Sequence, residues 1–197
     1  MREAGIGRVL VASLHQGIAD ILPNRLAFYE NWLNVEGLRD GTIGLAPLYA
    51  VLSFLRQEGD AYQIITTRAG EYAAEWTVQS MSAGRRAMIR ATPAWLRGRI
   101  LLRMAGRLVH SSYRGSRVIS RLQRGTASID LRASIFCSVR ETASWPMCVF
   151  YAAAIARFLH RFDLDAEVRI TECRAFGASA CTMAINIRTV QATAEAA

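Results

Sequence analysis

The sequence predicts an α+β fold, in which a helical N-terminal third precedes an antiparallel sheet of about four strands packed with helices. Two observations carry this prediction. Apolar residues recur at helical spacing through the first third, whereas the last third contains segments that alternate between apolar and polar residues. The 197 residues are 52% hydrophobic and 20% charged, a composition that supports a sizeable core and excludes an intrinsically disordered chain.

Three helices are expected before the middle of the chain. Apolar side chains recur at helical spacing over residues 9–22, and Pro23 ends that helix. A second helix is expected over 24–33 and a third over 45–58. The first two helices carry more apolar surface than a solvent-exposed extension needs. We therefore expect the helical region 1–60 to form a dimer interface and the protein to be a homodimer.

The middle of the chain is predicted to hold one extended segment and two helices. Residues 62–67 are rich in β-branched side chains, which favours a strand or an extended link. Residues 69–81 have helical periodicity, and residues 93–110 form an amphipathic helix in which an apolar stripe adjoins a basic one. The apolar stripe consists of Leu96, Ile100, Met104 and Leu108, and the basic stripe of Arg99, Arg103 and Arg107.

The last third carries the predicted sheet. The strands are expected over 118–122, 128–139, 167–173 and 181–187. A helix over 146–162 separates the second strand from the third. Alternation is strongest in the second strand, where it places Cys137 on the apolar face. A loop over 174–180 joins the last two strands, and the polar tail 191–197 is expected to be flexible.

Positive charge is concentrated in one part of the chain. All 24 basic side chains are arginines, and 11 of them lie in residues 83–129, which contain no acidic residue. The rest of the chain, with 13 arginines and 16 acidic residues, is slightly acidic. This basic window is interpreted as a solvated face, a site for carboxylates or phosphates of an amphipathic ligand, or a contact with an anionic membrane. Nucleic-acid binding is the least favoured interpretation, because no helix-turn-helix pattern occurs.

No segment is predicted to span a membrane or to direct secretion. The longest apolar run near the start, 45–55, is too short to cross a bilayer. Glu3 and Asp20 interrupt the pattern of a signal peptide. We therefore expect a cytoplasmic protein, in which cysteines are more often thiols or metal ligands than disulfides.

Three of the four cysteines have the placement of a metal site. Cys148 lies near the start of the predicted helix 146–162, and Cys173 and Cys181 lie at the two ends of a short hairpin loop. Soft thiolates placed in this way can converge on one tetrahedral Zn²⁺. The alternative is that the cysteines pack as small buried hydrophobic residues, and Cys137 fits this alternative best.

Two segments resemble a known family. The segment ECRAFGASACTMAI, residues 172–185, resembles the C-terminal signature of the 4-vinyl reductase domain, and SIFCSVRETASWPMCVFYAAAIARFL looks like the strand and helix before it. The resemblance covers roughly residues 70–190 and is clearest over 128–187. It implies a fold shared with core subunits of the TRAPP vesicle-tethering complex and with haem-type NO sensors. It also implies that region 61–190 is a ligand-binding domain with an internal apolar pocket.

The resemblance also implies a zinc site. In phenol-sensing members of the family, zinc is held by three cysteines and a glutamate, and Cys148, Cys173 and Cys181 match the three thiolates. Ile170 occupies the position of the glutamate in this sequence, so Glu172 is the expected fourth ligand, provided that a bulge turns it toward Cys173. Such a zinc would be structural, because four protein ligands leave no open position for a water molecule.

The expected function is non-enzymatic binding of a small hydrophobic or tetrapyrrole-like ligand, including a lipid, as a sensor, carrier or accessory protein acting through a partner protein. One alternative is an enzyme, or enzyme subunit, of bacteriochlorophyll or related tetrapyrrole metabolism. It is disfavoured because no nicotinamide or flavin motif occurs. The other alternative is a structural interaction module resembling TRAPP subunits. The candidate ligand-binding residues are Tyr72, Trp76, Trp95, Arg99, Arg103, Arg107, Trp145 and Tyr151.

Overall fold

The computed structural model describes residues 6–33, 44–123, 125–138 and 142–188, and these residues form an α+β fold, as predicted. The tail predicted for 191–197 lies outside the described residues. The helices are α1 (Arg8–Ile21), α2 (Leu26–Leu33), α4 (Leu45–Gln57), α5 (Asp60–Gln79), α6 (Ala83–Ala91), α7 (Ala94–Ser112) and α8 (Val149–His160). The strands are β1 (Arg117–Gln123), β2 (Thr126–Arg132), β3 (Asp165–Glu172) and β4 (Cys181–Arg188).

The four strands form one antiparallel sheet in the order β1-β2-β4-β3. Two hairpins, β1–β2 and β3–β4, lie side by side, and the chain crosses between them through α8. In β2 the side chains of Ala127, Ile129 and Leu131 are buried, whereas their sequence neighbours are exposed or half-buried. One face of the sheet is therefore covered, which is the ordinary arrangement for an antiparallel sheet.

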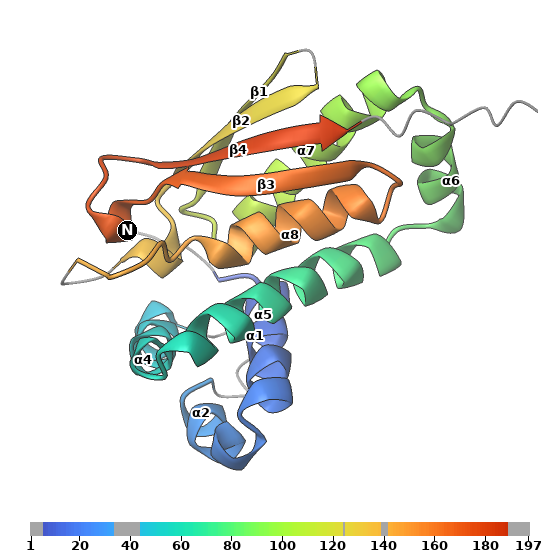
Figure 1. Cartoon of the computed structure of the whole chain (residues 1–197). Coiled ribbons are helices and arrows are strands. Elements are labelled where there is room, and N and C mark those ends of the chain that lie inside the picture. The colour runs from blue at the N-terminus through green and yellow to red at the C-terminus, as the bar shows by residue number, and fades with distance from the viewer. Residues whose placement is uncertain (1–5, 34–43, 124, 139–141, 189–197) are drawn as a thin grey trace, which may run out of the picture.

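The helices lie in layers on the covered face of the sheet (Figure 1). Helix α7 packs against β1 and α8 packs against β3, while α5 lies between α8 and α1. Helices α2 and α4 lie beside α1, at the end of the molecule that is farthest from the sheet (Figure 1).

Two glycines let α7 approach the sheet closely. A Cβ atom added at Gly98 would lie 3.4 Å from Ile187 Cδ1, and one added at Gly106 would lie 3.7 Å from Val118 Cβ. Because the two glycines are eight residues apart, they lie on the same face of the helix. The sheet therefore contacts the backbone of α7 there, and the arginine stripe lies on the outer face.

Most predicted elements are confirmed, but the prediction of an extended segment at residues 62–67 is wrong. These residues belong to α5, where Tyr62, Ile65, Thr66 and Ala69 are buried at helical spacing. The hydroxyl of Thr66 donates a hydrogen bond of 2.8 Å to the carbonyl of Tyr62. Packing against α1 and α8 therefore outweighs the weak local preference of β-branched residues for strands.

The predicted strand over 128–139 is too long, and one helix was not predicted. Strand β2 ends at Arg132, and the chain then forms the 3-10 turn η2 (Ile135–Cys137). The unpredicted helix is α6, which begins after Ser82, whose side chain accepts a hydrogen bond from the backbone N–H of Arg85 at 3.3 Å. This serine cap is the sequence signal that would have revealed the helix.

The N-terminal helices share one hydrophobic core with the rest of the domain. Leu10, Val11, Leu14 and Ile18 of α1 are fully buried, and α1 packs along α5. Much of the apolar surface that predicted a dimer interface is therefore used within the chain. The homodimer stays a prediction, as does the boundary near residue 60. No helix in the described part of the chain has the length and apolar character needed to cross a bilayer.

Candidate metal centre and ligand pocket

Four cysteines from four different segments meet beneath one end of the sheet. Cys137 ends the η2 turn, Cys148 precedes α8, Cys173 follows β3, and Cys181 opens β4. Their four Sγ atoms all lie within 4.8 Å of one another. The Sγ of Cys137 lies 3.0 Å from that of Cys148, 3.5 Å from that of Cys173 and 3.6 Å from that of Cys181.

The β3–β4 loop brings Cys173 and Cys181 together, as the sequence predicted. A 3-10 turn, η3 (Arg174–Phe176), follows Cys173, and Gly177 then adopts a left-handed conformation with φ of 88°. That conformation favours glycine, so the loop turns back within a few residues. The backbone N–H of Arg174 donates to the Sγ of Cys181 at 3.4 Å, which fixes the second sulfur beside the first.

The structure corrects the prediction that Cys137 packs on an apolar strand face. The strand ends five residues earlier, and Ala133 has a positive φ of 55°, which redirects the chain into η2. The Ser116 hydroxyl donates a 2.9 Å hydrogen bond to the Ala133 carbonyl and so supports this turn. Zinc prefers four ligands, and the sequence has four cysteines. That count was the signal for including Cys137.

The structure also corrects the assignment of Glu172 as a ligand. The register of β3 on β4 shifts between Ile170 and Glu172, so an irregularity of the expected kind is present. The Glu172 side chain is nevertheless exposed and accepts a hydrogen bond from the Thr182 hydroxyl at 3.3 Å. Cys137, and not Glu172, therefore lies beside the other three thiols.

Hydrogen bonds between the thiols set their acidity. Bonds from Cys137 and then Cys148 lower the pKa of Cys173 below its usual range. The bond between Cys148 and Cys137 raises the pKa of Cys148, which acts as a donor. The backbone N–H of Met147 also donates to the Sγ of Cys173, at 3.3 Å. Negative charge is thus stabilised on Cys173, while its neighbours keep their protons until a cation displaces them.

The residues fit a tetrahedral zinc ion. A Zn–S distance of about 2.3 Å places the sulfurs of a tetrahedral site about 3.8 Å apart. The closest sulfur pairs lie 3.0 to 3.6 Å apart, so small outward movements of the side chains suffice. Cys148, Cys173 and Cys181 are buried and Cys137 is half-buried, which gives a closed, all-sulfur set.

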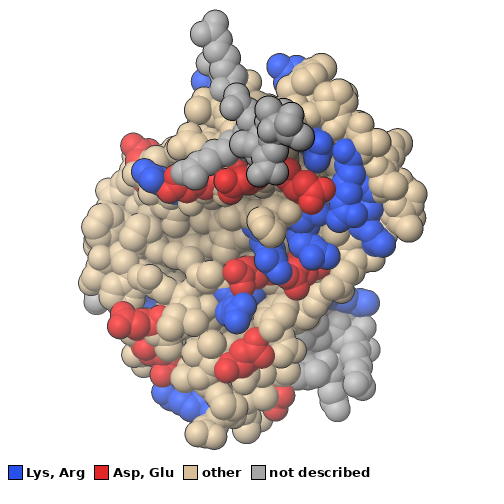
Figure 2. Space-filling model, turned by 45° about the vertical axis from the view of Figure 1, so that its right-hand side comes forward, with Lys and Arg blue, Asp and Glu red and all other residues tan. Residues whose placement is uncertain are grey.

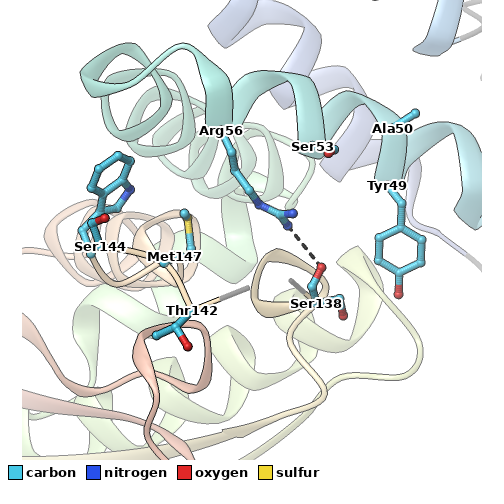
Figure 3. A pocket seen from close by; sticks show the side chains of 10 residues that line it. Tyr49, Ala50, Ser53, Arg56, Ser138, Thr142, Ser144 and Met147 are labelled. Atoms are coloured by element: carbon cyan, nitrogen blue, oxygen red, sulfur yellow. Dashed lines mark hydrogen bonds between the residues drawn. The ribbon is translucent and has the colours of Figure 1, made fainter. Parts of the chain in front are cut away.

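A pocket of about 850 Å³ lies next to this cluster. Helix α4 forms one wall, and Ser138 with the segment 142–147 forms the other; Figure 3 shows Arg56 reaching from α4 toward Ser138. The size falls in the range of about 300–1,000 Å³ that is typical of small-molecule sites. The lining residues are Tyr49, Ala50, Ser53, Arg56, Ser138, Thr142, Ala143, Ser144, Trp145 and Met147.

The pocket and the cysteine cluster share their walls. The Arg56 Nη2 donates to the carbonyls of Phe136 and Ser138, at 3.2 and 3.4 Å, and these residues flank Cys137. On the other side, Met147 lines the pocket and also donates its backbone N–H to Cys173. A change in the position of the cluster would therefore move both walls of the pocket.

Two polar atoms in the pocket wall have unused donor capacity. Arg56 Nε and Trp145 Nε1 are buried and have no hydrogen-bond partner among the described residues. A buried donor without a partner lowers stability by about 1–3 kcal/mol. The wall therefore offers two donors to a ligand that carries an acceptor oxygen.

The predicted ligand-binding residues do not converge on one site. Of the eight, Trp145 lines the large pocket. Tyr72 and Trp76 stack with ring centroids 5.5 Å apart, and Trp95 is 65% exposed at the start of α7. Tyr151 is fully buried against Phe136 and Phe150, so it belongs to the packed core. The remaining three are Arg99, Arg103 and Arg107, which are exposed on α7.

Sequence reasoning concentrated on aromatic residues and missed the wall that α4 provides. Tyr49, Ser53 and Arg56 lie on that helix at spacings of four and three residues, so they share one face. An arginine among apolar residues on a predicted helix was the available signal.

The histidines do not support a histidine-ligated haem in this pocket. His15 pairs with Glu30 at 2.8 Å, and the Nδ1 of His110 donates to the carbonyl of Ser116 at 3.1 Å. His160 is exposed at the end of α8. None of the three is among the residues that line the pocket.

The fold is shared with sensor proteins of known structure. An H-NOX protein from S. oneidensis in the Fe(II)NO ligation state aligns with a TM-score of 0.59 at 10% identity, over 93% of this chain and 100% of that one. A mutant H-NOX protein from K. algicida, Fe(II) and unliganded, gives 0.60 at 11% identity, over 94% and 98%. The phenol-responsive sensory domain of the transcription activator PoxR, with phenol, gives 0.53 at 15% identity, over 74% and 75%.

The sequence comparisons agree with the resemblance seen in the cysteine-containing segments. No curated protein matches the chain. The model of the 4-vinyl reductase domain family matches residues 128–187, a segment that spans all four cysteines, and so confirms the resemblance. Residues 128–187 of this chain therefore form a 4-vinyl reductase domain.

Proposed function

We propose that this protein binds a small, mainly apolar ligand in the pocket between α4 and the segment 138–147, and that it acts as a sensor or carrier without chemical turnover. The observation that carries the proposal is the shared wall. Arg56 and Met147 line the pocket and also hold the chain around Cys137 and Cys173. A pocket built on a rigid cluster keeps its shape, which favours binding.

The four cysteines, in this proposal, hold one structural Zn²⁺. Cys137, Cys148, Cys173 and Cys181 supply the thiolates, and the ion fixes η2, the start of α8 and the β3–β4 loop relative to one another. Thiolate ligation also fits a reducing compartment such as the cytoplasm.

The wall supports a ligand with an apolar body and one acceptor group. Tyr49, Ala50 and Met147 offer apolar surface, while Arg56 Nε and Trp145 Nε1 lack partners among the described residues. Phenol, which the related PoxR domain carries, has this chemistry. A metal-free tetrapyrrole, with its propionate carboxylates, is the larger ligand of the same kind.

The test fills the pocket from α4. Phenol and metal-free protoporphyrin are titrated into the zinc-loaded protein by calorimetry, with wild type compared to Ala50→Trp. Ala50 lines the pocket, whereas Ala46 is exposed one turn earlier on the same helix, so Ala46→Trp is the matched control. We expect Ala50→Trp to weaken binding at least tenfold and Ala46→Trp to leave it within twofold.

Two results would contradict the proposal. One is that neither probe binds wild-type protein at millimolar concentration. The other is that Ala46→Trp weakens binding as much as Ala50→Trp, because binding would then occur outside the pocket.

A further inference from the structure

The outer face of α7 carries a second, separate hollow. Its volume is about 490 Å³, and it lies between α7 and the edge strand β1. Arg103, Arg107 and His110 line one side, and Val118 and Ser120 of β1 line the other. The first two are four residues apart on the helix, so their guanidinium groups lie on the same face.

A smaller hollow adjoins the same arginine. Its volume is about 280 Å³, and it is lined by Arg107 together with Arg85 of α6 and Ser111 of α7. Ser111 also lines the larger hollow. Arg107 thus lies between two concave sites that both contain a second arginine and a hydroxyl group.

The arginines of this window divide into two groups. Arg86 donates to the carbonyl of Met81 at 2.7 Å, Arg97 donates to that of Phe162 at 3.1 Å, and Arg90 pairs with Asp163 at 3.6 Å. These three stabilise the fold. The side chains of Arg103 and Arg107 have no hydrogen bond or ion pair with any residue that the structure describes.

The surroundings of the hollow offer no negative charge in the sequence. Residues 83–129, which include α6, α7 and β1, contain no aspartate or glutamate. Figure 2 shows how strongly charge is segregated on one face of the molecule, where basic side chains gather in a column at the right. Two like charges at four-residue spacing repel each other, so an anion between them would relieve that repulsion.

We propose that the hollow between α7 and β1 binds a phosphate group. The forks of Arg103 and Arg107 supply two sets of donors, and the hydroxyl of Ser120 lies on the opposite wall. Guanidinium groups match the oxygens of phosphate in a bidentate manner, which a diffuse basic surface does not achieve. The site uses none of the residues that line the pocket at α4, so it stands or falls independently of the proposed ligand function.

The phosphate belongs to a soluble phosphate ester or to the headgroup of an anionic lipid. The shared chemistry is the same, and the experiment separates the two sources. The probes are inorganic phosphate and vesicles of phosphatidylcholine with or without phosphatidic acid.

The test compares two double variants that remove the same charge. Arg103→Gln with Arg107→Gln removes the two arginines of the hollow. Arg99→Gln with Arg114→Gln removes two exposed arginines that line neither hollow, the first of which lies over the ring of Trp95 at 5.7 Å. Phosphate binding is measured by calorimetry and by chemical shifts of the arginine Nε–H groups, and circular dichroism checks that each variant is folded.

We expect saturable phosphate binding that the first double variant weakens at least tenfold and the control variant changes by less than twofold. Vesicle binding that requires phosphatidic acid and is displaced by inorganic phosphate would assign the site to a lipid headgroup. Phosphate binding without vesicle binding would assign it to a soluble ester. Absence of saturable binding at millimolar phosphate, or equal weakening in both double variants, would overturn the proposal.

Discussion

The cysteine cluster and the arginine face of α7 show two ways of concentrating chemistry in one chain. The cluster brings together single residues from four segments, is largely buried, and is held by bonds between its own members. The arginine face comes from one helix, is exposed, and leaves its central side chains without partners among the described residues. Periodicity alone places the arginines, whereas only the tertiary fold places all four cysteines.

The largest expected effect is the loss of zinc from the buried region. Chelation is expected to lower the free energy of unfolding by more than about 2 kcal/mol, because the ion crosslinks distant segments of the folded state. Affinity should also fall as the pH is lowered from about 8 to about 5. Bonding to Cys137 raises the pKa of Cys148, so binding must displace a tightly held proton. Thermal unfolding with and without chelator checks this, and equal stability would contradict it.

The next effect concerns the contact between α5 and α8. A Cβ atom at Gly70 would lie 2.3 Å from the carbonyl oxygen of Phe150 and 3.0 Å from the nitrogen of Ala154. Gly70→Ala is therefore expected to lower the free energy of unfolding by about 1–3 kcal/mol, since neither backbone can yield easily.

Gly84→Ala in α6 is the matched control for Gly70→Ala. No atom lies within 4 Å of a Cβ at Gly84, so this change is expected to be neutral or to stabilise the helix by up to about 1 kcal/mol. Denaturant unfolding of both variants measures the contrast, and equal effects would show that α5 and α8 are not in close backbone contact.

A smaller effect is expected where the pocket meets the cluster. Arg56→Met removes the bonds to the carbonyls of Phe136 and Ser138, so it should lower the free energy of unfolding by about 1–2 kcal/mol and weaken phenol binding. Gln57→Met, at the exposed neighbouring position, is the control. If zinc content and phenol affinity were both unchanged in Arg56→Met, the pocket and the cluster would not be coupled.

The smallest effect is expected on the exposed arginine face. Arg103→Gln with Arg107→Gln should raise the free energy of unfolding by about 0.2–0.5 kcal/mol at low salt, because it removes a like-charge pair at four-residue spacing. The gain should shrink at high salt, where the repulsion is already screened. A loss of stability in this variant would show that the arginines hold the fold together.

The success of sequence reasoning follows the range of the interactions involved. The helix over 93–110 and the hairpin between Cys173 and Cys181 depend on local periodicity and a turn glycine, and both were predicted. The segment 62–67 is helical because α1 and α8 surround it, and local propensity is silent about that.

The site shows the same division between local and long-range information. Cys173 and Cys181 are neighbours across one loop, whereas Cys137 joins them only because β2 ends early and Ala133 turns the chain. The α4 wall of the pocket was missed for a related reason. Tyr49 and Ser53 lie far in sequence from the segment that they face, and no single stretch of sequence contains both walls.

The zinc content of two single variants tests the central claim most directly. Wild-type protein, Cys137→Ser and Glu172→Gln are purified in parallel, and zinc per chain is measured by native mass spectrometry with elemental analysis. The account predicts one zinc per wild-type chain, an unchanged value in Glu172→Gln, and a strongly reduced value in Cys137→Ser. Zinc-free wild-type protein, or loss of zinc in Glu172→Gln with retention in Cys137→Ser, would contradict a centre built from four cysteines.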